Sequence, residues 1–298
     1  MPTNGDVNKH SSPLSDRRAR RLEAALDELL EQLDPAERRR RDPVAIPRDY
    51  ENPRNRELAA LVASSLAYGR AELSMGAARE ALSRLGDDPA ATVTRAPASL
   101  PDRLDDFRYR MTGGRDLADL LAAAGRLRRR HGSLEAAYRS EPGGHLDRAS
   151  AFVGALRAER LRDDCHRGLR YLLPDPADGS ACKRLHLFFR WVGRGSDGVD
   201  LGLWTQPTPD QLRMPLDTHT ARISRYIGLT DRKSVDGEAS RQVTRALAQL
   251  DATDPVKYDF ALCHLGISEA CIHERSEDHC PDCPLDAICA VGPPPELA

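Results

Sequence analysis

The chain has 298 residues, 40% of them hydrophobic, which is enough to bury a substantial core in one large domain or two small ones. Its 44 basic and 46 acidic residues give a formal net charge of −2. This near balance excludes an overall polycation, so any nucleic-acid surface has to come from local clusters of basic side chains.

The first 43 residues predict a polar lead followed by one helix. Residues 1–14 are polar and lack periodicity, which favours disorder. From Asp16 the apolar residues fall on one stripe with charges opposite, which is typical of an amphipathic helix. Asp34-Pro35 interrupts this pattern, and Asp42-Pro43 marks a boundary. We therefore assign 15–43 to an N-terminal helical segment.

The central region reads as a series of further helices. Helical patterns span 55–85, with Tyr68-Gly69 inside them, then Asp116–His131, 133–140 and 146–162. Runs that alternate Val, Ile and Thr with polar residues are missing, so we expect no sheet. The fold class is therefore predicted to be all-α, with short loops between the helices.

A turn-rich stretch, residues 173–184, precedes a strongly apolar helix over 185–192. Lys183 is expected in the first turn of that helix, where the dipole disfavours a cation. A lysine that is partly desolvated there has a lowered pKa, which is the condition for an amine nucleophile that forms a Schiff base. The alternative is an ordinary exposed lysine.

Further helices are expected before the C-terminus. Asp217 is well placed to cap a helix that runs to Ile227 and is closed by Gly228. Most aspartates in such a place are structural caps. Helices over 236–250 and 254–265 follow, and the second leads into a group of cysteines.

Four cysteines lie within nineteen positions near the C-terminus, at C-x8-C-x2-C-x5-C spacing: Cys271, Cys280, Cys283 and Cys289. Because no signal peptide precedes the first helix, these thiols should be reduced, so metal ligation is favoured over disulfides. Four thiolates suit either zinc or a [4Fe-4S] cluster. Only one pair is close, with singletons on either side, and this favours iron–sulfur with zinc as the alternative.

The order of these motifs resembles the helix-hairpin-helix DNA glycosylase superfamily, specifically its endonuclease III-like members with a [4Fe-4S] cluster. The resemblance rests on a hairpin with a lysine, an apolar-Asp-Thr-His helix start, a helix ending in Gly-Ile-x-x-x-Cys, and the cysteine loop. The stretches SLAYGR, FRYRMTGGRDL, PLDTHTARI and DPVKYDFALCHLGI are most similar to a bacterial and archaeal branch that shares this core. The resemblance covers about residues 50–290.

The resemblance implies roles for particular residues. Asp217 falls at the catalytic aspartate of the superfamily, and Lys183 near the lysine that breaks the strand through a Schiff base. Tyr68 is a candidate wedge or stacking residue, with helix-end core packing as the alternative. Further expected nucleic-acid contacts come from Arg70, Arg184, His219, Arg222, His273, Arg275 and His279. The chain departs from the superfamily at the hairpin, where acidic residues are added and Lys183 lies four residues after Gly179 instead of two.

The resemblance also implies an arrangement and an activity. It predicts a two-lobed fold, with a central lobe over 44–213, a C-terminal lobe over 214–298, and the N-terminal helix packed on the latter. The implied activity is that of a DNA N-glycosylase, with or without AP lyase activity, on a flipped nucleotide in double-stranded DNA. The alternatives are a non-catalytic DNA- or RNA-binding module and an enzyme for modified bases in RNA. We expect a monomer in the cytoplasm, associated with the nucleoid and without membrane partners.

Overall fold

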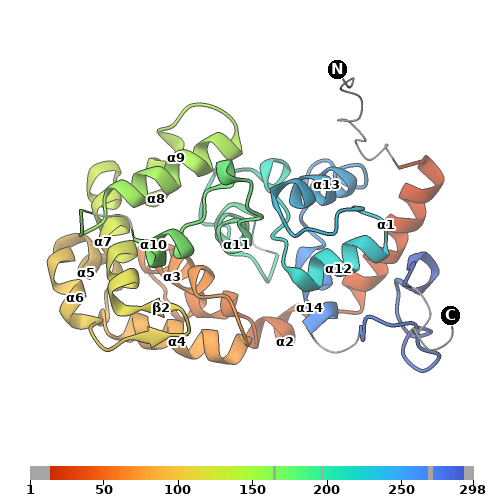
Figure 1. Ribbon diagram of the computed structural model, residues 1–298, viewed down its shortest axis with the longest axis horizontal. Helices are drawn as coiled ribbons and strands as arrows, with labels where there is room; N and C mark the ends of the chain where they lie inside the picture. Colours follow the sequence, from red (N-terminus) through yellow and green to blue (C-terminus); the bar gives the residue numbers. More distant parts are fainter. Residues whose placement is uncertain (1–13, 164–165, 196, 268–270, 292–298) are drawn as a thin grey trace, which may run out of the picture. The chain divides into compact units, whose positions relative to one another are not determined.

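The computed structural model describes residues 14–163, 166–195, 197–267 and 271–291. Of the predicted disordered lead over 1–14, all but Leu14 lies outside the described residues. The described chain is mostly helical and contains one two-stranded sheet (Figure 1). No helix in this part is both long enough and apolar enough to cross a bilayer.

The chain divides into two compact units. One unit spans Asp34–Pro215, and the other combines Met1–Leu33 with Leu216–Ala298. Helix α2 (Pro35–Arg40) therefore belongs to the larger unit, whereas α1 (Asp16–Glu31) belongs with the C-terminal segments.

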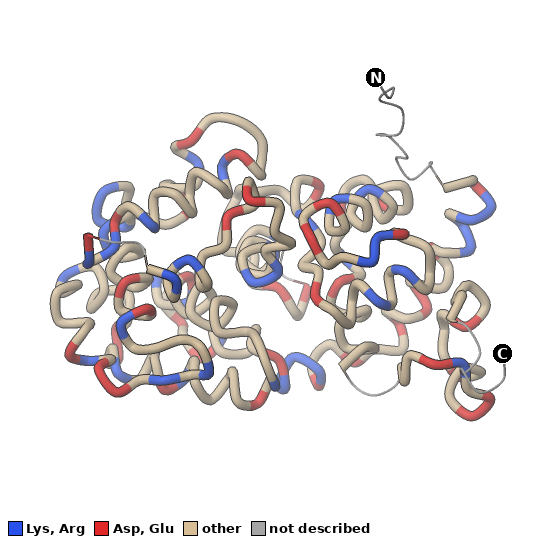
Figure 2. Tube along the Cα trace, viewed as in Figure 1, with Lys and Arg blue, Asp and Glu red and all other residues tan. Residues whose placement is uncertain are grey.

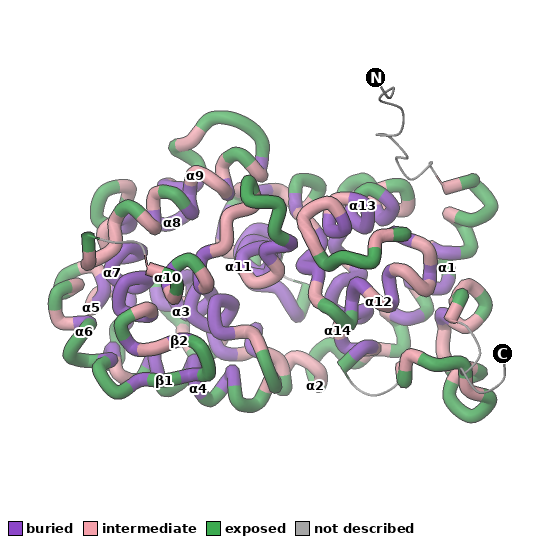
Figure 3. The backbone as a smooth tube through the Cα atoms, viewed as in Figure 1, coloured by how far each residue is buried: buried purple, intermediate pink, exposed green. Residues whose placement is uncertain are grey.

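The unit Asp34–Pro215 is built around three helices, α3 (Pro53–Ser65), α7 (Gly114–His131) and α11 (Lys183–Gly193). Figure 3 shows buried positions running along all three. The other elements of this unit are η1 (Pro43–Asp49), α4 (Ala71–Ser83), α5 (Pro89–Arg95), η2 (Pro97–Ser99), α6 (Leu100–Arg103), β1 (Arg108–Tyr109), β2 (Thr112–Gly113), α8 (Leu134–Arg139), α9 (His145–Ala158), α10 (Arg167–Leu172), η3 (Pro176–Asp178) and η4 (Pro209–Gln211).

An aromatic core and a buried ion pair hold this unit together. The aromatic side chains pack ring against ring and are nearly all fully buried: Tyr138, Phe152, Phe188, Phe189 and Trp204. Glu57 pairs with Arg128, and the Trp204 indole donates a hydrogen bond to Glu57 Oε1 at 2.8 Å. Burial raises the pKa of Glu57, and the positive charge of Arg128 offsets part of this increase.

The smaller unit packs α1 against helices from the other end of the chain. Its helices are α12 (Thr218–Tyr226), α13 (Gly237–Leu247), α14 (Asp259–Ile267) and the short η5 (Asp286–Ile288). The Tyr258 hydroxyl donates to Asp27 Oδ1 at 2.7 Å, and Arg21 donates to the Ala287 carbonyl at 2.9 Å. A Cβ on Gly266 would lie 2.9 Å from His219 Cβ, so glycine permits the close approach of α14 to α12.

The structure confirms several predicted elements and corrects others. Lys183 is the first residue of α11, and Asp217 caps α12 by accepting the Thr220 N–H at 2.9 Å. The helix expected from residue 254 begins only at Asp259. The expectation of no sheet is wrong, because β1 and β2 form a short antiparallel hairpin. Two residues per strand leave no room for an alternating pattern, and the turn lacks the Gly or Asn that marks most hairpins.

Candidate nucleic-acid interface

Each unit has its own group of candidate functional residues. In the unit Asp34–Pro215 this group comprises the loop between α3 and α4, the β1–β2 hairpin, α10 and the start of α11. In the smaller unit the group comprises the start of α12 and the cysteine loop, residues 271–289. We describe the two groups separately.

A group of three tyrosines and one arginine joins four elements of the larger unit. We call Tyr68, Tyr109, Tyr171 and Arg184 the tyrosine cluster. The ring centroids of Tyr68 and Tyr109 lie 4.9 Å apart, and those of Tyr68 and Tyr171 lie 5.5 Å apart at a right angle. The Arg184 guanidinium carbon lies 4.3 Å from the Tyr171 ring centroid and 5.1 Å from that of Tyr68, within the range of cation–π attraction.

The guanidinium of Arg184 faces inward. It donates to the carbonyl of Ser65, the last residue of α3, at 2.8 Å, and to the carbonyl of Tyr171 in the last turn of α10. A cation at the C-terminal end of a helix is favoured by the helix dipole, and here one cation serves two helices. Burial lowers the pKa of Arg184. The described contacts therefore give Arg184 a positioning role, whereas the sequence had suggested a phosphate contact.

Tyr68 is also engaged. Its hydroxyl donates to the Tyr109 carbonyl at 2.9 Å and lies 2.7 Å from Thr112 Oγ1, and the Tyr109 hydroxyl donates back to the Tyr68 carbonyl. Burial raises the pKa of both tyrosines. These reciprocal bonds attach the hairpin to the loop Tyr68–Arg70. Gly69 takes a left-handed conformation there, with φ +80°, and Arg70 is exposed beside it.

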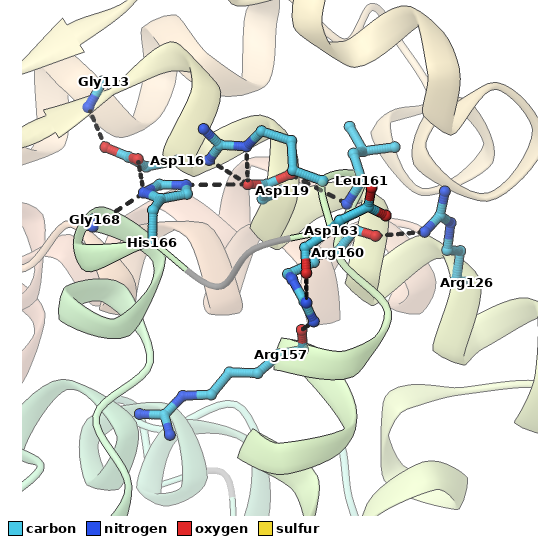
Figure 4. A network of polar contacts seen from close by, with 11 residues as sticks. Gly113, Asp116, Asp119, Arg126, Arg157, Arg160, Leu161, Asp163, His166 and Gly168 are labelled. Carbon is cyan, nitrogen blue, oxygen red and sulfur yellow. Dashed lines mark hydrogen bonds and ion pairs between the residues drawn. The ribbon is translucent and has the colours of Figure 1, made fainter.

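A polar network secures the base of the hairpin (Figure 4). The Gly113 N–H at the end of β2 donates to Asp116 Oδ2 at 2.9 Å. His166, which caps α10, lies with Nδ1 3.2 Å from Asp116 and with Nε2 3.2 Å from Asp119. Arg162 pairs with the buried Asp119 as well. The Gly168 N–H donates to His166 Nδ1 at 3.2 Å, and the imidazole lies between Asp116 and Asp119, so the network ties the hairpin and α7 to α10.

Lys183 lies next to the tyrosine cluster in sequence and is partly buried at the start of α11. The preceding residue, Cys182, takes a left-handed conformation with φ +44° and is 3% exposed. Burial raises the pKa of the Cys182 thiol to about 11, so this thiol is neutral and serves packing. Asp175, one of the added acidic residues, accepts from Ser150 at 2.6 Å and lies near Arg157, whereas Asp178 is exposed.

In the smaller unit, the start of α12 meets the cysteine loop through aromatic rings. The rings of His219 and His273 lie 5.8 Å apart, and the Tyr226 hydroxyl donates to the His273 carbonyl at 3.3 Å. Burial lowers the pKa of His273, and Arg222 and His219 lower it further. Three predicted nucleic-acid residues therefore lie together: His219 and Arg222 on α12, which Asp217 caps, and His273 next to it.

The cysteine loop carries four thiols. Burial raises the pKa of Cys283, and the thiols of Cys271, Cys289 and Cys280 raise it further. Hydrogen-bonded turns follow Cys280 and Asp286, and the four cysteines of the loop form no disulfide. A reduced four-thiol set is the donor chemistry of zinc and iron–sulfur sites.

The ligating geometry itself is not formed in the described chain. Among residues 14–163, 166–195, 197–267 and 271–291, no group of three or more His, Cys, Asp or Glu side chains is placed to hold a metal ion. Arg275 pairs with Asp286 inside the loop, and His279 is exposed. The thiol set therefore fits a metal by its chemistry alone, and ligation stays a proposal.

Sequence reasoning missed the hairpin and its two arginines, two members of the tyrosine cluster, and the network around His166. Tyr68 and the tyrosine of the stretch FRYR were visible as residues, but their contact spans more than 40 positions and leaves no local pattern in the sequence.

The comparisons give a single finding. The model of a family described as "Protein of unknown function (DUF2400)" matches residues 42–268, which is most of the chain. No curated protein and no solved structure matches the chain.

Proposed function

The chain belongs to the DUF2400 family, and we propose that it acts on DNA as an N-glycosylase of the helix-hairpin-helix type, with Lys183 supplying an AP lyase step. The observation that carries the proposal is the carboxylate of Asp217, which the Thr220 N–H holds at the start of α12 beside His219 and Arg222. A fixed carboxylate on a helix start that also carries a histidine and an arginine suits a reaction that develops positive charge on a sugar next to phosphates.

The chemistry assigns one role to each residue. With a flipped nucleotide bound, the Asp217 carboxylate stabilises the cationic sugar as the bond from C1′ to the base breaks and its electron pair leaves with the base. A water then forms the new bond to C1′ and gives its proton to Asp217. In the lyase step the neutral Lys183 amine adds to the C1′ aldehyde of the abasic sugar and loses water to form a Schiff base. Loss of a C2′ proton then breaks the 3′ C–O bond by β-elimination, and the phosphate leaves with the electron pair of that bond.

The cysteine loop has a structural part in this proposal. Cys271, Cys280, Cys283 and Cys289 would hold a [4Fe-4S] cluster, with zinc as the alternative. When bound, such a group orders the loop that carries His273 next to α12. Iron, sulfide and zinc analysis of the purified protein distinguishes the two.

Replacement of one carboxylate tests the glycosylase. Asp217→Asn keeps a good helix cap and removes the charge, so base release from duplexes that each carry one damaged base should fall by about 100-fold or more. Asp88→Asn is the matched control, because Asp88 caps α5 in the same way by accepting the Ala91 N–H at 3.0 Å. Unchanged base release in Asp217→Asn would show that the assigned mechanism is wrong.

Borohydride trapping tests the lyase. With duplex DNA that contains an abasic site, the wild-type protein should form a covalent adduct that Lys183→Ala abolishes. Lys233→Ala removes an exposed lysine and should leave the adduct intact. An adduct that persists without Lys183 would assign the amine elsewhere.

A binding-only role is the second candidate. The hairpin and the loop Tyr68–Arg70 present arginines on a rigid support that needs no catalytic group. Tight binding to duplex DNA with no base release and no trapped adduct would favour this role over catalysis.

A further inference from the structure

The tip of the β1–β2 hairpin combines strain with exposure. The register pairs Arg108 with Gly113 and Tyr109 with Thr112, so Arg110 and Met111 alone form the turn. We call these two residues the hairpin tip. Arg110 takes φ +51°, a left-handed conformation that L-residues disfavour. Met111 is 65% exposed, the highest fraction among the exposed large hydrophobic side chains of the described chain.

The tip cannot relieve this exposure by folding back. Both residues that flank it are buried, Tyr109 in the tyrosine cluster and Thr112 against the Tyr68 hydroxyl. The Arg110 side chain lies against Gly69, since a Cβ on Gly69 would be 2.8 Å from Arg110 Nη1. The buried neighbours therefore hold Met111 outward. An exposed apolar side chain fixed by buried neighbours is a better candidate for a contact residue than one that stands singly on a surface.

The surroundings of Met111 are basic. Arg108, Arg110 and Arg115 are exposed along the hairpin and the start of α7, and Arg70 is exposed beside Gly69 (Figure 2). Asp105 and Asp106 precede the hairpin, but Asp106 is paired with Arg84. An apolar side chain between arginines matches a stacked pair of bases between phosphates, because methionine and other apolar wedges insert between base steps while cations contact the backbone.

Tyr68 is a poorer wedge than the sequence suggested. Its hydroxyl makes two hydrogen bonds, and its ring is covered by Arg184. Inserting it between bases would break both bonds and dismantle the support of the hairpin.

We propose that the hairpin tip probes duplex DNA by inserting Met111 between stacked bases, with Arg110, Arg108 and Arg70 on the flanking phosphates. The proposal rests on the DNA binding in the proposed function and adds the element that selects weakened base steps. Insertion is easiest where stacking is already lost, so a mismatch or an abasic site is preferred over intact duplex.

The full-length protein and duplexes that carry 2-aminopurine test this. The wild type should bind a duplex with one abasic site more tightly than the intact duplex, and the probe next to that site should brighten as its base unstacks. Met111→Ala should lose about ten-fold of this preference together with the brightening, because a lost stacking contact is worth roughly that factor. Met111→Leu should retain both.

Two further variants separate insertion from general effects. Arg110→Gly accepts the positive φ without strain and removes the cation, so it should weaken binding to all duplexes and reduce the salt slope by about one. Leu73→Ala removes another exposed apolar side chain, 54% exposed on α4, and should leave the preference unchanged.

The outcomes distinguish the two proposals. If wild-type protein binds duplex DNA and Met111→Ala keeps the full preference and brightening, the hairpin-tip proposal is overturned while DNA binding stands. An equal loss in Leu73→Ala would also overturn it. If wild-type protein binds no duplex, both proposals fall.

Discussion

The hairpin region and the cysteine loop are both short, exposed segments, yet the described chain stabilises them in different ways. The hairpin is anchored by tyrosine hydroxyls, by Arg184 and by the carboxylates around His166. Within the described residues 271–291, which contain the cysteine loop, Leu285 alone is buried, and local turns connect the rest. A segment with so little apolar burial needs another source of stability, and four thiols supply one only when a metal or cluster joins them.

The largest expected effect follows from breaking the thiol set. Cys280→Ser should raise hydrogen exchange throughout 271–291, because the loss of one ligand removes stabilisation on the order of several kcal/mol from the loop. Exchange in the hairpin should not change. Cys263→Ser, in α14 outside the set, is the control. If residues 271–291 exchange equally in both variants and the wild type holds no metal, the thiol set does not stabilise the loop, and the contrast with the hairpin is wrong.

The next effect concerns the anchor of the hairpin. Arg184→Met keeps much of the side-chain volume but leaves the carbonyls that end α3 and α10 without a donor, so the free energy of unfolding should fall by about 2–4 kcal/mol. Arg184→Lys should fail to restore it, since lysine lacks the planar fork and stacks poorly. Arg108→Met, at an exposed position, should change stability by about 0.5 kcal/mol or less. Urea unfolding measures all three.

Acid should weaken the unit that carries the hairpin. Burial lowers the pKa of His186 to about 3, and burial and His186 lower that of His145 well below its usual value. In the unfolded chain both imidazoles take up a proton near pH 6.5, whereas in the folded chain they stay neutral to lower pH. The free energy of unfolding is therefore highest above pH 6.5 and falls as the pH drops toward 3. The slope is about 1.4 kcal/mol per pH unit for each histidine. His186→Gln should reduce the slope of stability against pH, and an unchanged slope would contradict the assignment.

The smallest effect separates the tyrosine bonds from packing. Tyr68→Phe should cost about 1–2 kcal/mol, because the Tyr109 carbonyl and the Thr112 hydroxyl lose their partner. A double-mutant cycle with Thr112→Val should show a coupling of about 1 kcal/mol. Zero coupling would mean that ring stacking alone attaches the hairpin.

The sequence predicted local features better than distant ones. The cap at Asp217, the helix start at Lys183 and the closure at Gly228, which has φ +70°, follow from residue preferences within a few positions. The contacts of Arg184 with Ser65, and of Tyr68 with Tyr109, depend on packing across 119 and 41 residues. Arg110 adopts a conformation that its residue type disfavours, and only the surrounding contacts can impose it.

The reciprocal bonds between Tyr68 and Tyr109 have a consequence for the thermodynamics of association. They join the loop Tyr68–Arg70 and the hairpin into one body, so the spacing between Arg70 and Arg110 is set before any ligand arrives. A preorganised pair of cations loses little conformational entropy when a ligand binds. Calorimetry should therefore show a smaller unfavourable entropy of binding than a flexible pair would give.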